Sequence, residues 1–143
     1  MKNKNLISLL LLATLLVSAC SSSAELTVQD AWARPANAGE NGAAYFIIEN
    51  GSNIDDTLLS VSSYIAAATE IHMSMVDGTG VMPMQMQEAV IVPAKDKVEF
   101  KPGGLHVMFV SLTRDLKTGD TIMLTLDFKE AGSLTIQVPV RAQ

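Results

Sequence analysis

The residues best suited to chemistry are histidines and methionines that fall in two short stretches. Residues 71–86 and 103–108 together hold both histidines of the 143-residue chain and six of its eight methionines. The only cysteine, Cys20, lies near the N-terminus, so the rest of the chain offers no thiolate ligand. Thioether sulfur selects Cu(I), whereas carboxylate and carbonyl oxygens suit Mg, Ca and Mn. The two stretches therefore predict a site for a soft metal ion, with copper as the candidate.

Residues 81–87 alternate methionine with other residue types. On a strand, this pattern sends Met82, Met84 and Met86 to one face and the two glutamines to the other. Methionine also fills irregular cores and rims, so one or two of the three are expected to serve only packing. The pattern by itself therefore leaves open which of these methionines are ligands.

The same alternation brings the histidines toward the methionines. A hairpin turn over residues 77–80 would place His72 and Met84 on neighbouring strands. His106 and Met108 are two residues apart and so share one face of a later strand, while the residues between and after them point into the core. Each histidine alone has an ordinary explanation as a hydrogen-bonded surface residue. Together, two histidines and two methionines are predicted to meet at one end of the fold.

Short apolar or alternating runs separated by turn residues predict an all-β chain. Three alanines at residues 66–68 favour helix by propensity, so a strand is expected there only from about Thr69. The expected strands are residues 26–32, 43–49, 56–62, 69–75, 81–87, 90–93, 98–101, 106–112, 121–129 and 134–140. Strands at this regular spacing predict an antiparallel sandwich or barrel.

Composition excludes several functional classes. Apolar residues make up 48% of the chain and charged residues 17%, which is enough to bury one core. The net charge is −5 and the basic residues form no stripe, which argues against nucleic-acid binding. A blue-copper electron carrier needs a thiolate beside two histidines, and a serine hydrolase would need a motif such as Gly-x-Ser-x-Gly. Neither feature is present, so we expect no enzyme activity.

The N-terminus has the pattern of an export signal. Lys2 and Lys4 precede an apolar run at residues 6–17, and small residues lead to Cys20. The pattern resembles a bacterial lipoprotein signal, which would be removed as residues 1–19 and leave Cys20 as the lipidated N-terminus. Residues 20–24 would then be a short tether before a domain at residues 25–143. The alternative is an ordinary export signal with an incidental cysteine.

The spacing of the candidate ligands resembles a family motif. The periplasmic copper chaperones called PCuAC carry His-Met, ten residues, Met, twenty-one residues, then His-x-Met. This sequence has His72-Met73, ten residues, Met84, twenty-one residues, and His106-Val107-Met108, so both spacers match. Further similar segments are Gly-Ala-Ala-Tyr at residues 42–45, Pro-Gly-Gly at 102–104 and Leu-Lys-Thr-Gly-Asp at 116–120.

The resemblance implies both a fold and a function. The implied fold is a cupredoxin-like Greek-key antiparallel β-sandwich, and the implied ligand set for one Cu(I) per chain is His72, Met84, His106 and Met108. Copper would be delivered to the Cu-A centre of a terminal cytochrome oxidase or to a Cys-pair assembly protein, at the periplasmic or outer side of a membrane. Some members carry a C-terminal His- and Met-rich tail associated with Cu(II), and no second site of that kind is expected here.

Some assignments stay open at this point. Alternation places Met73 on the strand face opposite His72, so we expect it to pack, while Met75 and Met82 are possible neighbours of the site. Two alternatives to a chaperone are a lipoprotein that sequesters copper and a structural lipoprotein with a methionine-rich contact surface.

Overall fold

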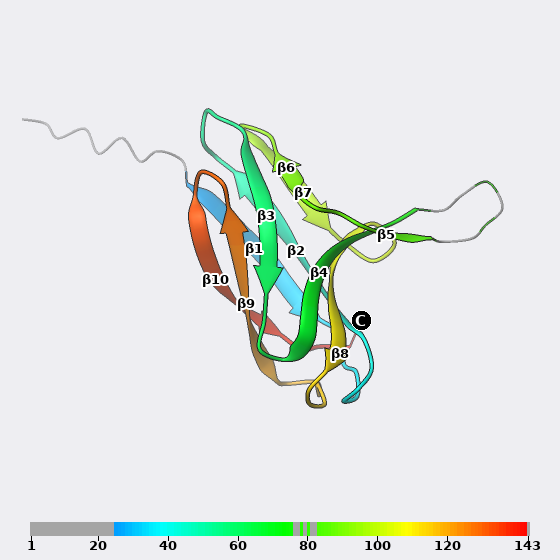
Figure 1. The fold of residues 1–143 in the computed structure, drawn as a ribbon. Helices are drawn as coiled ribbons and strands as arrows, with labels where there is room; N and C mark the ends of the chain where they lie inside the picture. The colour runs from blue at the N-terminus through cyan, green and yellow to red at the C-terminus, as the bar shows by residue number, and fades with distance from the viewer. Residues whose placement is uncertain (1–24, 76–77, 79, 81–82, 143) are drawn as a thin grey trace, which may run out of the picture.

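The computed structural model describes residues 25–75, 78, 80 and 83–142, and within them the chain folds into two packed β-sheets (Figure 1). The signal segment at residues 1–19, Cys20 and the tether at residues 20–24 lie outside the described residues. The strands are β1 (Leu26–Ala33), β2 (Gly42–Asn50), β3 (Asp56–Ser62), β4 (Ala66–Ser74), β5 (Met84–Met86), β6 (Val90–Val92), β7 (Asp96–Phe100), β8 (Leu105–Leu112), β9 (Thr121–Phe128) and β10 (Gly132–Pro139).

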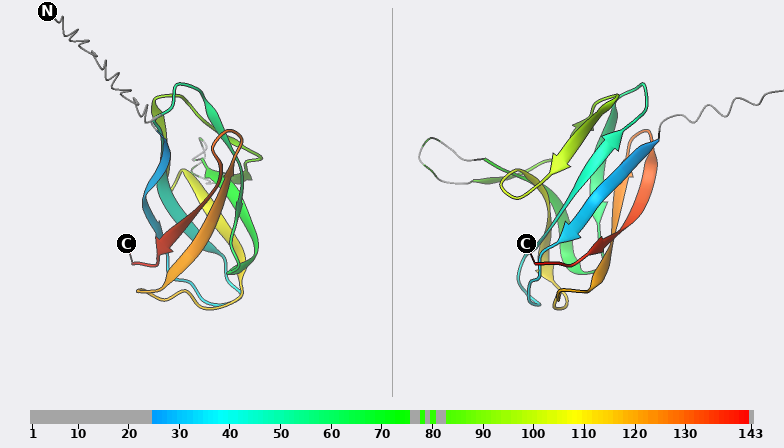
Figure 2. Two further views of the ribbon diagram at one scale, coloured as in Figure 1. Left: turned by 90° about the vertical axis from the view of Figure 1, so that its left-hand side faces the viewer. Right: turned by 180° about the vertical axis from the view of Figure 1, so that it is seen from behind.

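One sheet has six strands in the order β1-β2-β7-β8-β4-β5, and the other has four in the order β10-β9-β3-β6. Neighbours in each sheet are often distant in sequence, so connections cross between the layers, as Figure 2 shows from two further sides. Pairing is antiparallel between named strands, except where Phe100 of β7 meets Leu105 of β8 in parallel. The predicted all-β sandwich is thus confirmed.

The core lies between the two sheets and explains why the strands form. In β8, Val107 and Phe109 are fully buried, and the residues that alternate with them face outward. On neighbouring strands of the same sheet, the rings of Phe46 and Phe100 stack with centroids 4.4 Å apart. Alternation of this kind buries one face of each strand and leaves the other face free to carry functional groups.

The start of β4 corrects one prediction. The strand begins at Ala66 and not at about Thr69, although the alanines favour helix by propensity. Ala66 and Ala68 pair with Leu112 and Val110 of β8, so ladder hydrogen bonds override the local preference. β4 is therefore continuous from Ala66 to Ser74 and reaches the candidate site at His72.

The end of β4 and the short strand β5 extend beyond the two packed layers (Figures 1 and 2). β5 pairs only at this end of β4, through residues 72–74. The six-stranded sheet therefore has a projecting edge next to the predicted ligands.

Among the described residues, no helix is long and apolar enough to cross a membrane.

Candidate metal centre

β4 and β8 place the two histidines side by side on the outward face of the six-stranded sheet. His72 and His106 are direct partners in the antiparallel register, and their ring centroids lie 5.9 Å apart. One step along the same face, Glu70 is the partner of Met108. The residues between them in each strand, at positions 71 and 107, are buried in the core. The two strands thus present a block of four outward side chains, near the end of β4 and the start of β8.

β5 adds two thioethers at the edge of this block. Met86 lies directly opposite His72, and Met84 lies opposite Ser74, one step further toward the projecting end. Directly opposed residues share a sheet face, so both sulfurs lie on the same side as the histidines. Met84 and Met86 are 59% and 57% exposed. The prediction that His72 and Met84 fall on neighbouring strands is confirmed, and the register places Met86 directly opposite His72.

The remaining methionines near the site differ in position. Met73 is half-buried and pairs with Leu105 and Gln85, so it alternates to the face opposite His72 as predicted. Met75 follows β4 and is exposed. Met82 lies outside the described residues.

His72 has one paired and one unpaired ring nitrogen. Its Nε2 lies 2.7 Å from a carboxylate oxygen of Glu70. Its Nδ1 is buried and has no hydrogen-bond partner among the described residues. Leaving such a polar atom unsatisfied costs about 1–3 kcal/mol, so this nitrogen is suited to receive a ligand.

His106 is held by the backbone and by an aromatic neighbour. Its Nδ1 donates to the carbonyl of Gly104 at 3.0 Å, and the residue is only 7% exposed. The ring of Tyr45 lies 6.5 Å away between centroids, and Trp32 packs against Tyr45 at 4.7 Å. Burial raises the pKa of the Tyr45 hydroxyl, against the opposing influence of the nearby Arg34 guanidinium. The phenol is therefore a neutral neighbour of His106 at physiological pH.

The donor set of this face suits a soft ion. Among the described residues, no group of three or more His, Cys, Asp or Glu side chains is arranged to hold a metal. Besides the Glu70 carboxylate that pairs with His72, this face carries thioether sulfurs on β5 and β8, and imidazole with thioether suits copper in its reduced state. The buried lone pair on Nδ1 of His72 fits the same conclusion, because a bound metal would satisfy it. The residues present therefore fit Cu(I).

Sequence reasoning missed Glu70 and left the role of Met86 open. Glu70 is two residues before His72, so alternation would have placed both on one strand face. Met86 was assigned to the same face as Met84, but the register that puts it opposite His72 depends on where the hairpin turns. Spacing therefore predicts the strand face of both residues but not the register of Met86.

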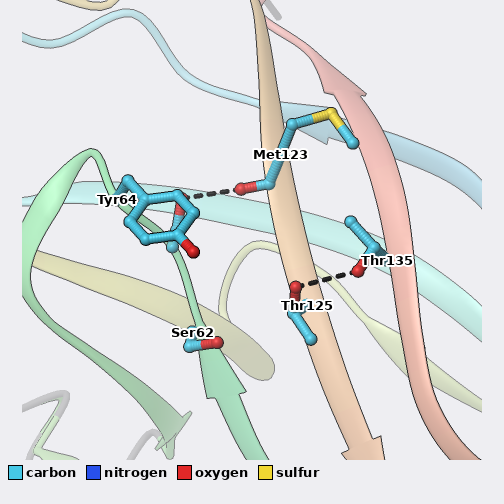
Figure 3. A pocket seen from close by; sticks show the side chains of 6 residues that line it. Ser62, Tyr64, Met123, Thr125 and Thr135 are labelled. Carbon is cyan, nitrogen blue, oxygen red and sulfur yellow. Dashed lines mark hydrogen bonds between the residues drawn. The ribbon is translucent and has the colours of Figure 1, made fainter.

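A hollow lies on the four-stranded sheet (Figure 3), lined by Ser62, Ser63, Tyr64, Met123, Thr125 and Thr135. Its hydroxyls are largely paired within the hollow. Ser63 donates to the Met123 carbonyl at 2.7 Å, and the hydroxyls of Thr125 and Thr135 lie 3.0 Å apart. None of the six lining residues is a histidine, a cysteine or an acid. This hollow therefore lacks the imidazole and carboxylate groups found at the candidate metal centre.

Comparison with known proteins places the chain in a family. The family described as "Putative lipoprotein LpqE-like" matches residues 26–140, which include every described strand. The chain belongs to the LpqE-like family. A protein of Leifsonia xyli subsp. xyli named as a putative lipoprotein is 25% identical over 114 residues, covering 80% of this chain and 68% of that protein. An uncharacterized protein of Rickettsia prowazekii is 28% identical over 113 residues. The match covers 76% of this chain and 62% of the Rickettsia protein.

Solved structures extend this result to PCuAC domains. This LpqE-like chain is 25% identical to the copper-bound PCuAC domain of PmoF2, with a TM-score of 0.69 over 83% of this chain and 94% of that domain. The apo PCuAC domain of PmoF1 is 26% identical, with a TM-score of 0.68 and coverages of 83% and 95%. The solution structure of a Cu(I) protein from Deinococcus radiodurans shares the fold, with a TM-score of 0.63 and 24% identity over 85% of this chain and 83% of that one. The predicted resemblance to PCuAC domains and the cupredoxin-like sandwich are confirmed.

Proposed function

We propose that this protein is a copper chaperone that binds one Cu(I) through His72, Met84, His106 and Met108. The observation that carries the proposal is the buried, unpartnered Nδ1 of His72 on a sheet face that also presents a second imidazole and thioethers. The similarity to a copper-bound PCuAC domain, which has the same fold, supports copper as the metal.

The chemistry of this set favours a carrier over a catalyst. Two imidazoles and two thioethers are neutral, so none of the four ligands supplies the negative charge that would favour Cu(II). A catalytic metal site needs an open position beside firmly held ligands, whereas here one proposed ligand, Met84, is exposed at a projecting edge. The arrangement suits a metal that is to be passed on.

The acceptor is expected to use thiolates. Soft thiolate binds Cu(I) more strongly than thioether or imidazole, so copper would move from this site to a reduced Cys pair. The Cu-A subunit of cytochrome oxidase, or a Cys-pair protein that assembles it, is a partner of this kind. A protein that sequesters copper would instead retain it against such an acceptor.

The location proposed for this transfer is the outer side of a membrane. The export pattern at residues 1–19 and the cysteine at position 20 resemble a lipoprotein signal, and a relative is named as a lipoprotein. Copper handled there meets an oxidising environment in which a cysteine site would be at risk of disulfide formation, whereas His and Met remain competent ligands.

An anaerobic titration with Cu(I) against a competing chelator tests the proposal. The purified protein should bind one equivalent of Cu(I), and much less Cu(II) when titrated separately. A reduced Cys-pair copper acceptor added afterwards should remove the metal. Failure to bind Cu(I) would exclude a copper function, while retention against excess acceptor at equilibrium would favour storage.

A further inference from the structure

We propose that Glu70 is a positioning residue that fixes the tautomer of His72, so that His72 offers Nδ1 and His106 offers Nε2 to the metal. The inference rests on the proposed Cu(I) site and adds a residue outside its ligand set. It also assigns, for each histidine, the nitrogen that binds.

The hydrogen bond of His72 determines which nitrogen carries the proton. A neutral imidazole has one N–H donor and one lone-pair acceptor, and an ionised carboxylate can only accept. The 2.7 Å contact with Glu70 therefore places the proton on Nε2. Nδ1 is left with its lone pair, and this is the nitrogen that is buried without a partner.

Strand geometry makes this contact specific. Glu70 and His72 are two residues apart on β4 and share the outward face, so the carboxylate lies alongside the imidazole edge. The side chains of His72 and Glu70 are 13% and 35% exposed, so the contact is partly shielded from water. Charge-assisted hydrogen bonds of this length are stronger than neutral ones. A carboxylate bonded to the distal nitrogen of a metal-binding histidine is a recurrent way to orient the ring and raise its basicity.

His106 has the opposite tautomer for a different reason. Its Nδ1 donates to the Gly104 carbonyl, which can only accept, so its lone pair is on Nε2. The same carbonyl accepts the backbone N–H of Ser74 at 3.1 Å, which ties it to the end of β4. His106 is therefore oriented by the backbone, whereas His72 depends on one replaceable side chain.

The arrangement also affects charge at the site. Cu(I) bound by neutral ligands keeps its single positive charge, and Glu70 brings one negative charge to the same face. The carboxylate thus offsets the charge of the bound ion without being a ligand.

Long-range ¹H–¹⁵N NMR of the metal-free protein tests the assignment directly. The expected pattern is Nε2–H for His72 and Nδ1–H for His106. In Glu70→Ala, His72 should become a mixture of tautomers, and the affinity for Cu(I) should fall about 10–100-fold. Glu70→Gln keeps an amide oxygen that can accept from Nε2–H, so it should retain the His72 tautomer and most of the affinity. Glu99→Gln is the matched control, because Glu99 is a half-exposed strand carboxylate paired at 2.9 Å with Lys101.

The outcomes separate this inference from the proposed function. A proton on Nδ1 of His72 in the unaltered protein overturns the inference whether or not any variant folds. Unchanged affinity in a folded Glu70→Ala protein also overturns it while leaving the copper function intact. If the unaltered protein does not bind Cu(I), the proposed function fails, and that result is known before any variant is compared.

Discussion

Met84 and Met86 are a matched pair for testing the ligand assignment. They share residue type, strand, face and nearly equal exposure, and differ only in register. Leucine keeps the volume of methionine and removes the sulfur. We expect Met84→Leu to weaken Cu(I) binding by more than about tenfold. Loss of a residue that only hydrogen-bonds to a metal ligand already costs about that much affinity, and loss of a ligand should cost more. Met86→Leu should bind nearly as well as the unaltered protein.

Competition titrations of the two variants decide between the thioethers. If Met86→Leu loses affinity and Met84→Leu does not, the ligand is Met86, which lies directly opposite His72. Equally small losses of Cu(I) affinity in both variants would show that neither methionine of β5 is a ligand. Thermal unfolding of the metal-free variants controls for changes in stability.

At the residue scale, the sequence predicts on which strands and faces the proposed ligands lie, but not the hydrogen bonds around them. The shared face of His106 and Met108 and the position of Met84 on the strand next to His72 follow from spacing, and the strand pairings agree with both. Glu70 was not predicted because a carboxylate does not belong to a soft donor set. Its role depends on the rotamers of two neighbouring side chains, which spacing does not determine.

β8 carries core side chains on one face and two of the proposed ligands on the other. Val107 is fully buried between His106 and Met108 in sequence, yet points to the opposite side of the sheet. Val107→Ala should lower the free energy of unfolding by about 2 kcal/mol, because it removes buried methyl groups and leaves a cavity. Its Cu(I) affinity in the folded state should be almost unchanged.

Met108→Leu should show the reverse result, with little change in stability and a loss of Cu(I) affinity. Urea unfolding of the metal-free proteins and competition titrations of the folded ones measure the two effects separately. A large loss of affinity in Val107→Ala would show that the two faces of β8 are coupled.

The elements themselves were predicted more reliably than their ends. β3 has the predicted bounds, Asp56–Ser62, because turn residues flank it, although its alternation is interrupted between Leu58 and Ser60. The start of β4 was wrong by three residues, since pairing with β8 outweighs the helix preference of alanine. Sheet order is a further property that strand patterns do not supply, because it depends on contacts distant in sequence.

At the scale of the whole molecule, the connection from β8 to β9 joins the two sheets and contributes a pH-dependent element of stability. A carboxylate oxygen of Asp120 accepts the backbone N–H of Lys117 at 3.0 Å and a guanidinium N–H of Arg114 at 3.2 Å. The hydrogen bond from Lys117, with that from Arg114, lowers the pKa of Asp120 below its ordinary value of 3.8. A lowered pKa in the folded state means stabilisation that is present above the unfolded value and lost as pH falls through the folded one.

Asp120→Asn should therefore be less stable than the unaltered protein at pH 7, and the difference should shrink below about pH 4. Chemical denaturation at a series of pH values measures this. A difference that stays constant down to pH 2 would mean that the charge of Asp120 does not contribute.

The whole protein is expected to be attached to a membrane through lipid on Cys20. Several acyl chains on Cys20 would each add about 0.8 kcal/mol per buried methylene and hold the protein firmly. Cys20→Ser should move the protein from the membrane fraction to the soluble fraction. Mass spectrometry of the unaltered protein should show a lipidated N-terminus, and a soluble, lipid-free protein would disprove the lipoprotein assignment.

The projecting edge at β5 imposes an order of events on metal exchange. Met84 is 59% exposed at that edge, whereas His106 is only 7% exposed within the sheet. For an ion bound as proposed, an incoming thiolate can reach the metal from the β5 side while the imidazoles still hold it. The thioether of Met84 would leave first and His106 last, so exchange would be associative, without release of a free ion. The observed rate should then rise in proportion to acceptor concentration, whereas a rate independent of acceptor would mean that unaided dissociation comes first.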